Sequence, residues 1–222
     1  MKNWIHGYRR FLLFVVLYGL FRTACADWNP IPSGSMRPSL LEGDVVFVNR
    51  LAYAVKVPLT DVIVARTSEP RRGDIVTFSS PRDGTRLIKR VIALPGDIVT
   101  LRDKRLTIDG ESVQYRGRAI RLEPLGDGRT TVAEEQEEML AGRSHEVQWL
   151  PERTAAPDFG PVVVPPDQYL MLGDNRDNSA DSRYFGFVPR ERLIGRAERI
   201  LVSAEILGNW LPRFNRFGKR LD

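Results

Sequence analysis

The sequence contains little cysteine, histidine or lysine, three residue types that often act in catalysis or bind metals. Its 222 residues include one cysteine, two histidines and five lysines. With Cys25 alone, an intramolecular disulfide and a cysteine-rich metal site are both excluded. Internal repeats and low-complexity tracts are also absent. The 42% hydrophobic and 27% charged residues are typical of a globular protein, long enough for one domain and an appendage.

Positive charge is present in only a small surplus. The net charge is +5, and most of the basic residues are arginine. No basic run with interleaved aromatic residues forms a base-reading surface, so we expect no nucleic-acid partner. An anionic membrane surface accounts for the surplus equally well.

Long apolar runs are scarce too, and the single one lies near the N-terminus, from Phe11 to Phe21. It follows a basic stretch, which permits two interpretations. One is a cleaved secretory signal, with Ala24–Ala26 as an Ala-x-Ala cleavage site. The other is an uncleaved anchor, although 11 apolar residues are short against the roughly 20 that span a bilayer.

Length alone favours the cleaved signal, whereas the segment that follows from Pro30 favours the anchor. We predict a transmembrane anchor over residues 11–28, with residues 1–10 in the cytoplasm. Aromatic residues on both sides lengthen the apolar core, and Arg22 snorkels to the headgroups. The rest of the chain is then exported.

Short segments rich in valine and isoleucine recur along the exported part, closed by Gly, Pro and Asp. This pattern predicts an antiparallel strand meander and a mainly β fold. Leu193 to Leu207 fits either strands or a short helix. The expected strands cover Asp44–Val48, Asp74–Phe78, Arg86–Ala93, Ile98–Leu101, Arg105–Ile108, Val162–Val164 and Gln168–Leu172.

The texture changes between residues 103 and 165, which are more polar and less periodic. We predict a smaller β-subdomain or long loops here, inserted into a catalytic core of residues 29–102 and 166–207. The acidic run Glu134–Glu138 is interpreted as a solvated face. In the tail, residues 208–222, aromatic and basic residues alternate, which fits a lipid-facing patch or a frayed terminus.

Two serines separated by a glycine, Ser33 and Ser35, lie just beyond the expected anchor. This position suggests a nucleophile held near a lipid surface. A serine needs a base, most often histidine, but His6 precedes the apolar run and His145 lies in the polar insert. A neutral lysine can serve instead, whereas arginine cannot because its pKa is too high.

Lys89 is the lysine within the most apolar expected strand. Alternation places it on one face with Leu87 and Val91, while Ile88 and Arg90 lie on the other. A lysine among apolar neighbours is desolvated, and its pKa falls towards the range where it accepts a proton. Alternation alone favours the alternative, a lysine on an edge strand that points to water.

The segment from Gly173 to Arg183, GDNRDNSADSR, invites comparison with a calcium loop. Arg176 at the third position, Ser179 where glycine is required and Phe185 at the twelfth all fail that pattern. A turn network, in which Asp and Asn side chains bind backbone amides, fits better. We expect no metal and no cofactor.

Three motifs together resemble the type I signal peptidases, the bacterial leader peptidases. They occur in the family's order and cover Ile31 to Asp97 and Gln168 to Pro189, whereas the insert and the tail match loosely. The matching segments are IPSGSMRPSL at 31–40 for the serine box, RGDIVTF at 72–78 with IKR at 88–90 and LPGD at 94–97 for the lysine box, and GDNRDNSADSR at 173–183 with GFVP at 186–189 for the last box.

The resemblance implies a membrane-bound serine endopeptidase with a signal-peptidase-like antiparallel β core and one N-terminal transmembrane helix. Ser35 would be the nucleophile and Lys89 the general base. The Ser35 N–H and the Ser33 hydroxyl would form the oxyanion hole. Ser179 would orient the Lys89 amine.

In the same resemblance, Asp181 and Arg183 would pair and hold the last box beside the site. The substrates would be exported preproteins with small residues, typically alanine, at the first and third positions before the cut. The signal peptide would bind as an added strand. Its side chains would enter shallow apolar pockets formed by Ile31, Pro32, Met36, Leu40, Leu87 and Ile88, each of which also fits a core position.

The implied location is the bacterial inner membrane, with a single pass and the catalytic domain on the periplasmic side. The expected partners are signal peptides and the phospholipid membrane, with the secretion machinery as a candidate. The chain departs from the best-known members in having one apolar segment instead of two and a compact insert without cysteines. We predict that Ala24–Ala26, which resembles a substrate, is retained.

Two other functions compete with this one. A peptidase of the same family that matures conjugative pilin is separated only weakly by the sequence. A membrane-tethered β-rich binding protein with an inactive site would be expected to lack Ser35 or Lys89, and both are present. Self-cleaving Ser–Lys repressors would need an N-terminal helix-turn-helix in place of the apolar segment.

Overall fold

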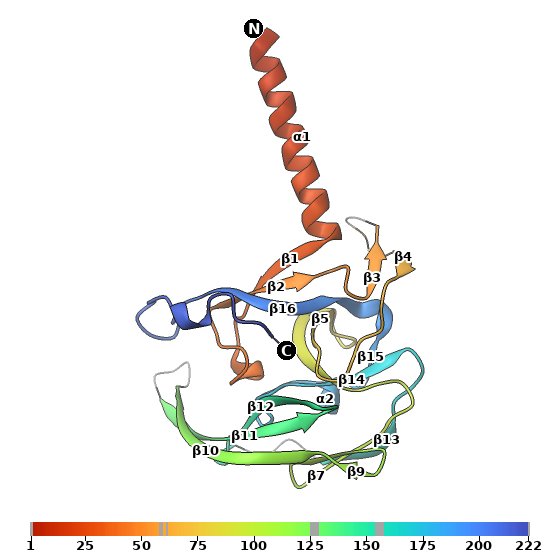
Figure 1. Ribbon diagram of the computed structural model, residues 1–222, viewed down its shortest axis with the longest axis vertical. Helices are drawn as coiled ribbons and strands as arrows, with labels where there is room; N and C mark the ends of the chain where they lie inside the picture. The colour runs from red at the N-terminus through yellow and green to blue at the C-terminus, as the bar shows by residue number, and fades with distance from the viewer. Residues whose placement is uncertain (1, 58–59, 61, 125–128, 154–157, 222) are drawn as a thin grey trace.

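A long helix and a β-rich body make up the computed structural model. The structure describes residues 2–57, 60, 62–124, 129–153 and 158–221, without the side chains of 2–7, 20, 21 and 23. Helix α1 (Lys2–Ala24) projects from the body as an isolated rod with the N-terminus at its far tip (Figure 1). Strand β1 (Ala26–Pro30) joins this rod to the body.

The expected transmembrane helix over residues 11–28 is not supported by the structure. The helix ends at Ala24, and residues 26–28 already belong to a strand. Within the described part of the chain, no helix combines the length and the apolar composition needed to cross a membrane. Charged residues flank an apolar run of 11 residues. The Arg22 guanidinium carbon lies 4.2 Å from the centroid of the Trp28 ring.

The main sheet has seven strands in the order β1-β2-β16-β5-β6-β14-β15, and all its neighbours run antiparallel. The prediction of a mainly antiparallel β fold is therefore confirmed. The segment from Leu193 begins as a strand. The strands that follow β1 in this sheet are β2 (Asp44–Asn49), β5 (Ile75–Ser79), β6 (Arg86–Ala93), β14 (Gln168–Leu172), β15 (Val188–Pro189) and β16 (Leu193–Ser203).

Three smaller sheets and four short helices complete the described fold. A four-stranded sheet contains β7 (Ile98–Arg102), β8 (Arg105–Ile108), β9 (Glu111–Ser112) and β13 (Phe159–Val163). A three-stranded sheet contains β10 (Gln114–Pro124), β11 (Thr130–Leu140) and β12 (Arg143–Trp149), and a hairpin contains β3 (Ala54–Lys56) and β4 (Ile63–Arg66). The short helices are η1 (Gly34–Met36), α2 (Ser182–Phe185), η2 (Arg190–Arg192) and η3 (Phe214–Arg216).

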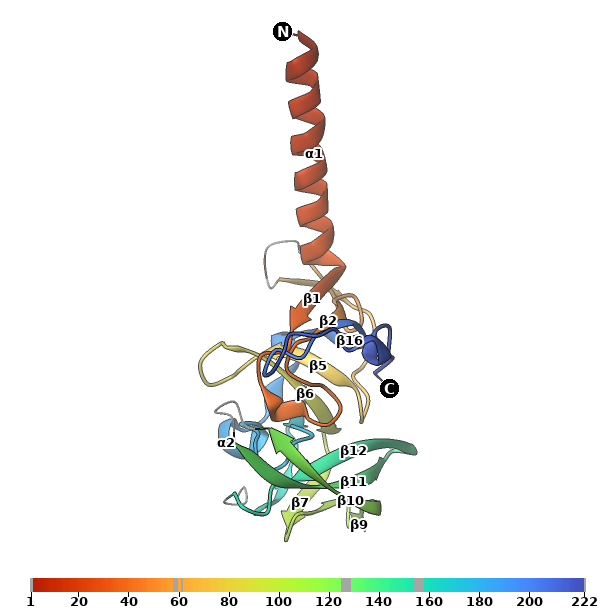
Figure 2. The ribbon, with the colours of Figure 1, turned by 90° about the vertical axis from the view of Figure 1, so that its left-hand side faces the viewer.

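The sheet β10–β11–β12 lies at the end of the body opposite α1 (Figures 1 and 2). It belongs to the segment 103–165, for which a subdomain or long loops are expected. Because β7 of the expected core pairs with β13 of the expected insert, the two parts share a sheet. The division of the chain into core and insert stays a prediction.

The acidic run Glu134–Glu138 was predicted to be a solvated face, and this is wrong for two of its members. Glu138 is fully buried and Glu135 nearly so. Glu135 and Glu138 are three positions apart on β11, the central strand of its sheet, and so lie on opposite faces of it. The physical reason for their burial is that each carboxylate has an arginine partner: Arg121 pairs with Glu135, and Arg176 pairs with Glu138, whose carboxylate also lies 3.2 Å from His145 Nε2.

Candidate active site

The serine turn is a short 3-10 helix, η1, that begins immediately after Ser33. Ser33 has extended backbone angles, φ −139° and ψ 153°, and its exposed side chain forms no capping hydrogen bond. The turn is tied to the last box by Asn175, whose backbone N–H donates to the Ser35 carbonyl at 3.2 Å. The Asn175 side chain donates to the Gly34 carbonyl at 3.0 Å. Both serines are thereby presented on a turn with fixed backbone.

Lys89 meets Ser35 from strand β6. The Lys89 Nζ lies 2.7 Å from Ser35 Oγ and 2.9 Å from the Ile88 carbonyl, and only 2% of Lys89 is exposed. The two residues are 54 positions apart in the chain. The alternative of an edge lysine that points to water is wrong, because β6 lies between β5 and β14.

Burial decides the acid–base behaviour of Lys89. Desolvation disfavours the ammonium form and lowers the pKa of Lys89 from 10.5 to about 8. The nearby carboxylates of Asp181 and Asp174 oppose this fall, and the positive charge of Arg183 adds to it. At neutral pH, about a tenth of such a lysine is neutral and able to accept a proton.

A buried ion pair that sequence reasoning missed lies beside Lys89. Arg90 donates to both carboxylate oxygens of Asp174, at 2.8 and 2.7 Å, and to the Gly73 carbonyl at 2.8 Å. Burial alone would raise the pKa of Asp174, but the ion pair with Arg90 holds it below its usual range. The pair joins β6 to the start of the last box. The sequence feature that could have indicated this pair is Arg90 itself, an arginine within an apolar strand.

Asp181 and Arg183 form the second buried pair of the last box, at 2.8 and 2.7 Å. Asp181 also accepts from the Gly173 N–H at 3.1 Å and precedes α2 as its N-cap, accepting from the Arg183 N–H. Arg183 in turn donates to the Arg176 carbonyl at 2.7 Å. The pair therefore closes the loop from Gly173 to Arg183 on itself.

Ser179 is buried within this loop. A Cβ at Gly173 would lie 2.3 Å from Ser179 Oγ and 2.4 Å from the Ser35 carbonyl oxygen, so the three residues pack tightly together. Among the described residues, the Ser179 hydroxyl has no hydrogen-bond partner. A role for it in orienting Lys89 therefore stays a prediction.

The expected pocket residues divide between core and surface. Ile31, Met36 and Leu40 are buried in one apolar cluster, against which Ile88 packs, and Met36 and Leu40 expose no surface. Leu87 packs on the opposite face of β6, against Phe78 and its neighbours. Pro32 is exposed, and Leu87 and Ile88 are half-buried. Only these last three keep surface that a ligand can reach.

The three-stranded sheet braces the last box from the side of β12 and β11. Gln148 of β12 pairs with Asn175, donating to the Asp174 carbonyl at 2.9 Å and accepting from the Arg176 N–H at 2.9 Å. Arg176 donates to both oxygens of Glu138 at 2.6 and 2.7 Å. Burial alone would raise the pKa of Glu138, but Arg176 and His145 lower it.

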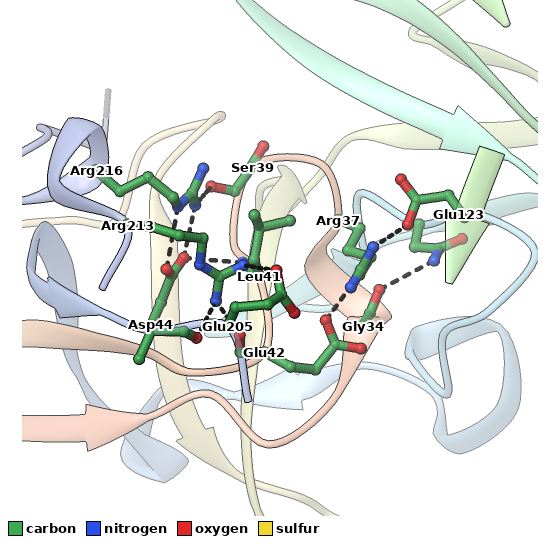
Figure 3. A network of polar contacts seen from close by, with 12 residues as sticks. Gly34, Arg37, Ser39, Leu41, Glu42, Asp44, Glu123, Glu205, Arg213 and Arg216 are labelled. Carbon is green, nitrogen blue, oxygen red and sulfur yellow. Dashed lines mark hydrogen bonds and ion pairs between the residues drawn. The ribbon is translucent and has the colours of Figure 1, made fainter. Parts of the chain in front are cut away.

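The C-terminal tail holds the other end of the serine box (Figure 3). Arg216 donates to the buried Asp44 carboxylate at 3.1 and 2.6 Å and to the Ser39 carbonyl at 3.0 Å. The Leu41 N–H also donates to Asp44, at 2.9 Å. This part of the tail is consequently fixed, which does not fit a frayed terminus, while Trp210 remains largely exposed.

A serine hydroxyl beside a buried amine can form a nucleophile, and this is the chemistry that the arrangement supports. His145 is not part of this contact and lies instead 3.2 Å from Glu138, while the side chain of His6 is outside the described residues. In the part of the chain that the structure describes, no group of three or more His, Cys, Asp or Glu side chains is placed to hold a metal ion.

Comparisons with known proteins agree on one family. Residues 1–202 match the family model described as signal peptidase, peptidase S26. A signal peptidase I of Pseudomonas fluorescens is 39% identical over 220 residues, which cover 93% of this chain and 75% of that protein. A signal peptidase I of Pseudomonas aeruginosa is 34% identical with the same coverage. A crystal structure of a signal peptidase I from Enterococcus faecalis V583 is 33% identical, covers 58% of this chain and 97% of that chain, and aligns with a TM-score of 0.38.

Proposed function

Since this chain belongs to the signal peptidase family, peptidase S26, we propose that it is a serine endopeptidase that removes N-terminal signal peptides from exported preproteins. Ser35 is the nucleophile and Lys89 the general base. The observation that carries the assignment is the 2.7 Å contact between Ser35 Oγ and a Lys89 amine that is only 2% exposed.

The first step is transfer of the Ser35 proton to neutral Lys89. In the neutral state, the Ser35 hydroxyl donates to Nζ, and Ser35 Oγ attacks the scissile carbonyl carbon as the proton moves. The Ser35 N–H and the Ser33 hydroxyl stabilise the negative charge on the carbonyl oxygen. The exposed, uncapped side chain of Ser33 supports this role, because its hydroxyl is available to a substrate.

Collapse of the tetrahedral intermediate breaks the peptide bond and leaves an acyl ester on Ser35. The Lys89 ammonium gives its proton to the departing amine of the mature protein. A water molecule that donates its proton to neutral Lys89 then attacks the ester carbonyl. The ester C–O bond breaks, Lys89 returns the proton to Ser35 Oγ, and the signal peptide leaves with a new carboxylate. Asp181, Arg183 and Ser179 hold the last box against Lys89 and Ser35 throughout both steps.

The substrate class of this proposal is a preprotein with small residues, typically alanine, before the cut. An extended signal peptide adds to the enzyme sheet beside the serine turn. Pro32, Leu87 and Ile88 keep reachable surface near the dyad. Ile31, Met36 and Leu40 support that surface from below, and their burial allows little room for larger side chains.

Attachment to the bacterial inner membrane through α1 is part of the proposal. The side chains from Phe11 to Tyr18 are all apolar and exposed around the helix, an arrangement that is unfavourable in water and favourable in lipid. The basic residues before them favour a cytoplasmic N-terminus and a periplasmic body. The hairpin β3–β4 lies at the same end of the body as α1 (Figure 1). Val62, just before β4, and Val64, within it, are exposed.

Cleavage of a purified preprotein in detergent tests the function. Wild type is expected to release the signal peptide, whereas Ser35→Ala and Lys89→Ala are expected to lose cleavage by at least about a thousandfold. Lys56→Ala is a control outside the dyad, since Lys56 donates to backbone carbonyls of Glu191 and Leu193. Undiminished cutting by either dyad variant would exclude the Ser–Lys assignment.

A further inference from the structure

Arg37 lies two residues after Ser35 and links the serine turn to a distant strand. Its side chain is only 9% exposed and forms ion pairs with two carboxylates, Glu42 and Glu123 (Figure 3). The Arg37 Nε donates to Glu42 at 2.7 Å, and NH1 donates to Glu123. Glu123 belongs to β10, 86 residues further along the chain.

The Arg37–Glu42 pair packs directly on the backbone of the serine turn. A Cβ at Gly34 would lie 2.8 Å from Glu42 Oε1, 3.2 Å from Arg37 Cδ and 3.3 Å from Arg37 Nε. The Arg37 N–H also closes the turn by donating to the Gly34 carbonyl at 3.1 Å. The Arg37 and Glu42 side chains therefore lie close against Gly34, whose peptide bond to Ser35 carries the N–H that would serve the oxyanion hole.

The same three-stranded sheet holds the opposite half of the site. Glu138 of β11 binds Arg176 of the last box, while Glu123 of β10 binds Arg37 of the serine turn. β10 and β11 are paired, so the two contacts are joined by a sheet. One sheet thus contacts both the serine turn and the loop that carries Ser179.

We propose that Arg37 and Glu123 are positioning residues, through which the sheet β10–β11–β12 sets the orientation of the Ser35 backbone N–H for catalysis. The proposal rests on the proposed peptidase function. It gives the segment 103–165 a role in the chemistry without contact with the reacting atoms. The buried, doubly paired guanidinium is the feature that makes this coupling specific.

Steady-state cleavage of a signal-peptide substrate tests the coupling. Glu123→Ala is expected to lower kcat roughly tenfold with KM changed less than about twofold, because small misplacement of a catalytic group lowers the rate of the chemical step. Arg37→Met is expected to lower kcat by roughly a hundredfold. Glu123→Gln, which can still accept a hydrogen bond, should recover most of the loss. Glu111→Ala changes an exposed glutamate of β9 and is the matched control, with wild-type kcat expected.

A double variant separates coupling from general damage. If both residues act through one contact, Arg37→Met with Glu123→Ala is expected to cut as slowly as Arg37→Met alone. The acid limb of the pH–rate profile should stay at its wild-type midpoint in every variant, because Lys89 is not part of the contact. All rates are measured under conditions in which urea unfolding shows every variant to be folded. A lower rate then does not reflect a loss of folded protein.

Three results would overturn the proposal. They are a wild-type kcat in Glu123→Ala, a loss of kcat in the double variant equal to the product of the two single losses, or a change confined to KM. Parallel assays of Ser35→Ala and Lys89→Ala distinguish failure of the proposed peptidase function from failure of the positioning role. Cleavage that survives in those variants contradicts the peptidase mechanism itself. Cleavage that they abolish, with unchanged kcat in folded Glu123→Ala, contradicts only the positioning role.

Discussion

Replacing Lys89 with methionine should remove a pH dependence of stability as well as abolish cleavage. The burial that makes Lys89 a usable base also disfavours its charged form in the folded protein. Its pKa is lowered from 10.5 to about 8, with desolvation as the main cause. Methionine is similar in length and apolar, so Lys89→Met keeps most of the packing while it removes the titrating group.

The sign of the effect follows from proton binding. Between about pH 8 and pH 10.5 the unfolded chain keeps a proton on Lys89 that the folded chain has lost. The free energy of unfolding therefore rises with pH across this window. The full difference between 10.5 and about 8 in pKa corresponds to about 3 kcal/mol, most of which develops between about pH 7 and pH 10.

Urea unfolding in detergent micelles, followed by tryptophan fluorescence, measures this quantity. The difference in unfolding free energy between wild type and Lys89→Met is expected to increase by about 2–3 kcal/mol from about pH 7 to pH 10. The acid limb of kcat/KM in wild type should have its midpoint near the same pKa of about 8. A difference that does not vary with pH, or a rate that is flat down to about pH 5, would refute a buried, neutral-amine base.

Three further predictions concern the surroundings of the dyad. Gly173→Ala should lower both stability and kcat, because the new Cβ would lie 2.4 Å from the Ser35 carbonyl oxygen; thermal unfolding and cleavage rates check this, and wild-type values for both would contradict the packing. Glu138→Gln should destabilise the protein by about 3–5 kcal/mol, because Arg176 would lose its buried carboxylate. Glu134→Gln on the same strand, where the partner Arg118 is exposed, should cost less than about 1 kcal/mol, and equal losses would argue against the buried pair. The N-terminal segment should remain attached and membrane-bound, because Ala26 is buried and paired with Asn49 in β1–β2; intact mass and alkaline carbonate extraction test this, and a product that begins at Asp27 would show self-cleavage.

Ser35 and Lys89 are predictable because the family motifs contain them, whereas alternation alone favours an edge lysine that points to water. Ser35 lies in a Ser-Gly-Ser turn next to an apolar run, and Lys89 lies in a strand whose alternation gives it apolar neighbours. These three motifs also occur along the chain in the family's order. The same local signals predicted the antiparallel strands around them, since valine and isoleucine between turn residues favour strands wherever they occur.

The supporting charges were not predictable in this way. Arg90 and Asp174 are 84 residues apart, and Arg37 and Glu123 are 86 apart. A charged residue in a sequence is read as exposed unless its partner is known, which is why Glu138 was assigned to a solvated face. The anchor predicted over residues 11–28 rested on the segment that follows from Pro30 rather than on the short apolar run, and the described helix does not support a membrane span.

By itself, the sequence determined the types of element, because backbone propensity, alternation and turn chemistry act between near neighbours, and its three family motifs pointed to Ser35 and Lys89. Only the tertiary structure decided that β6 is an interior strand, which removes Lys89 from water and lowers its pKa. It also decided that a sheet from the polar segment contacts both halves of the site, through the ion pairs of Glu123 and Glu138 with Arg37 and Arg176. These outcomes depend on which strands become neighbours, and strand order is a property of the whole chain rather than of any segment.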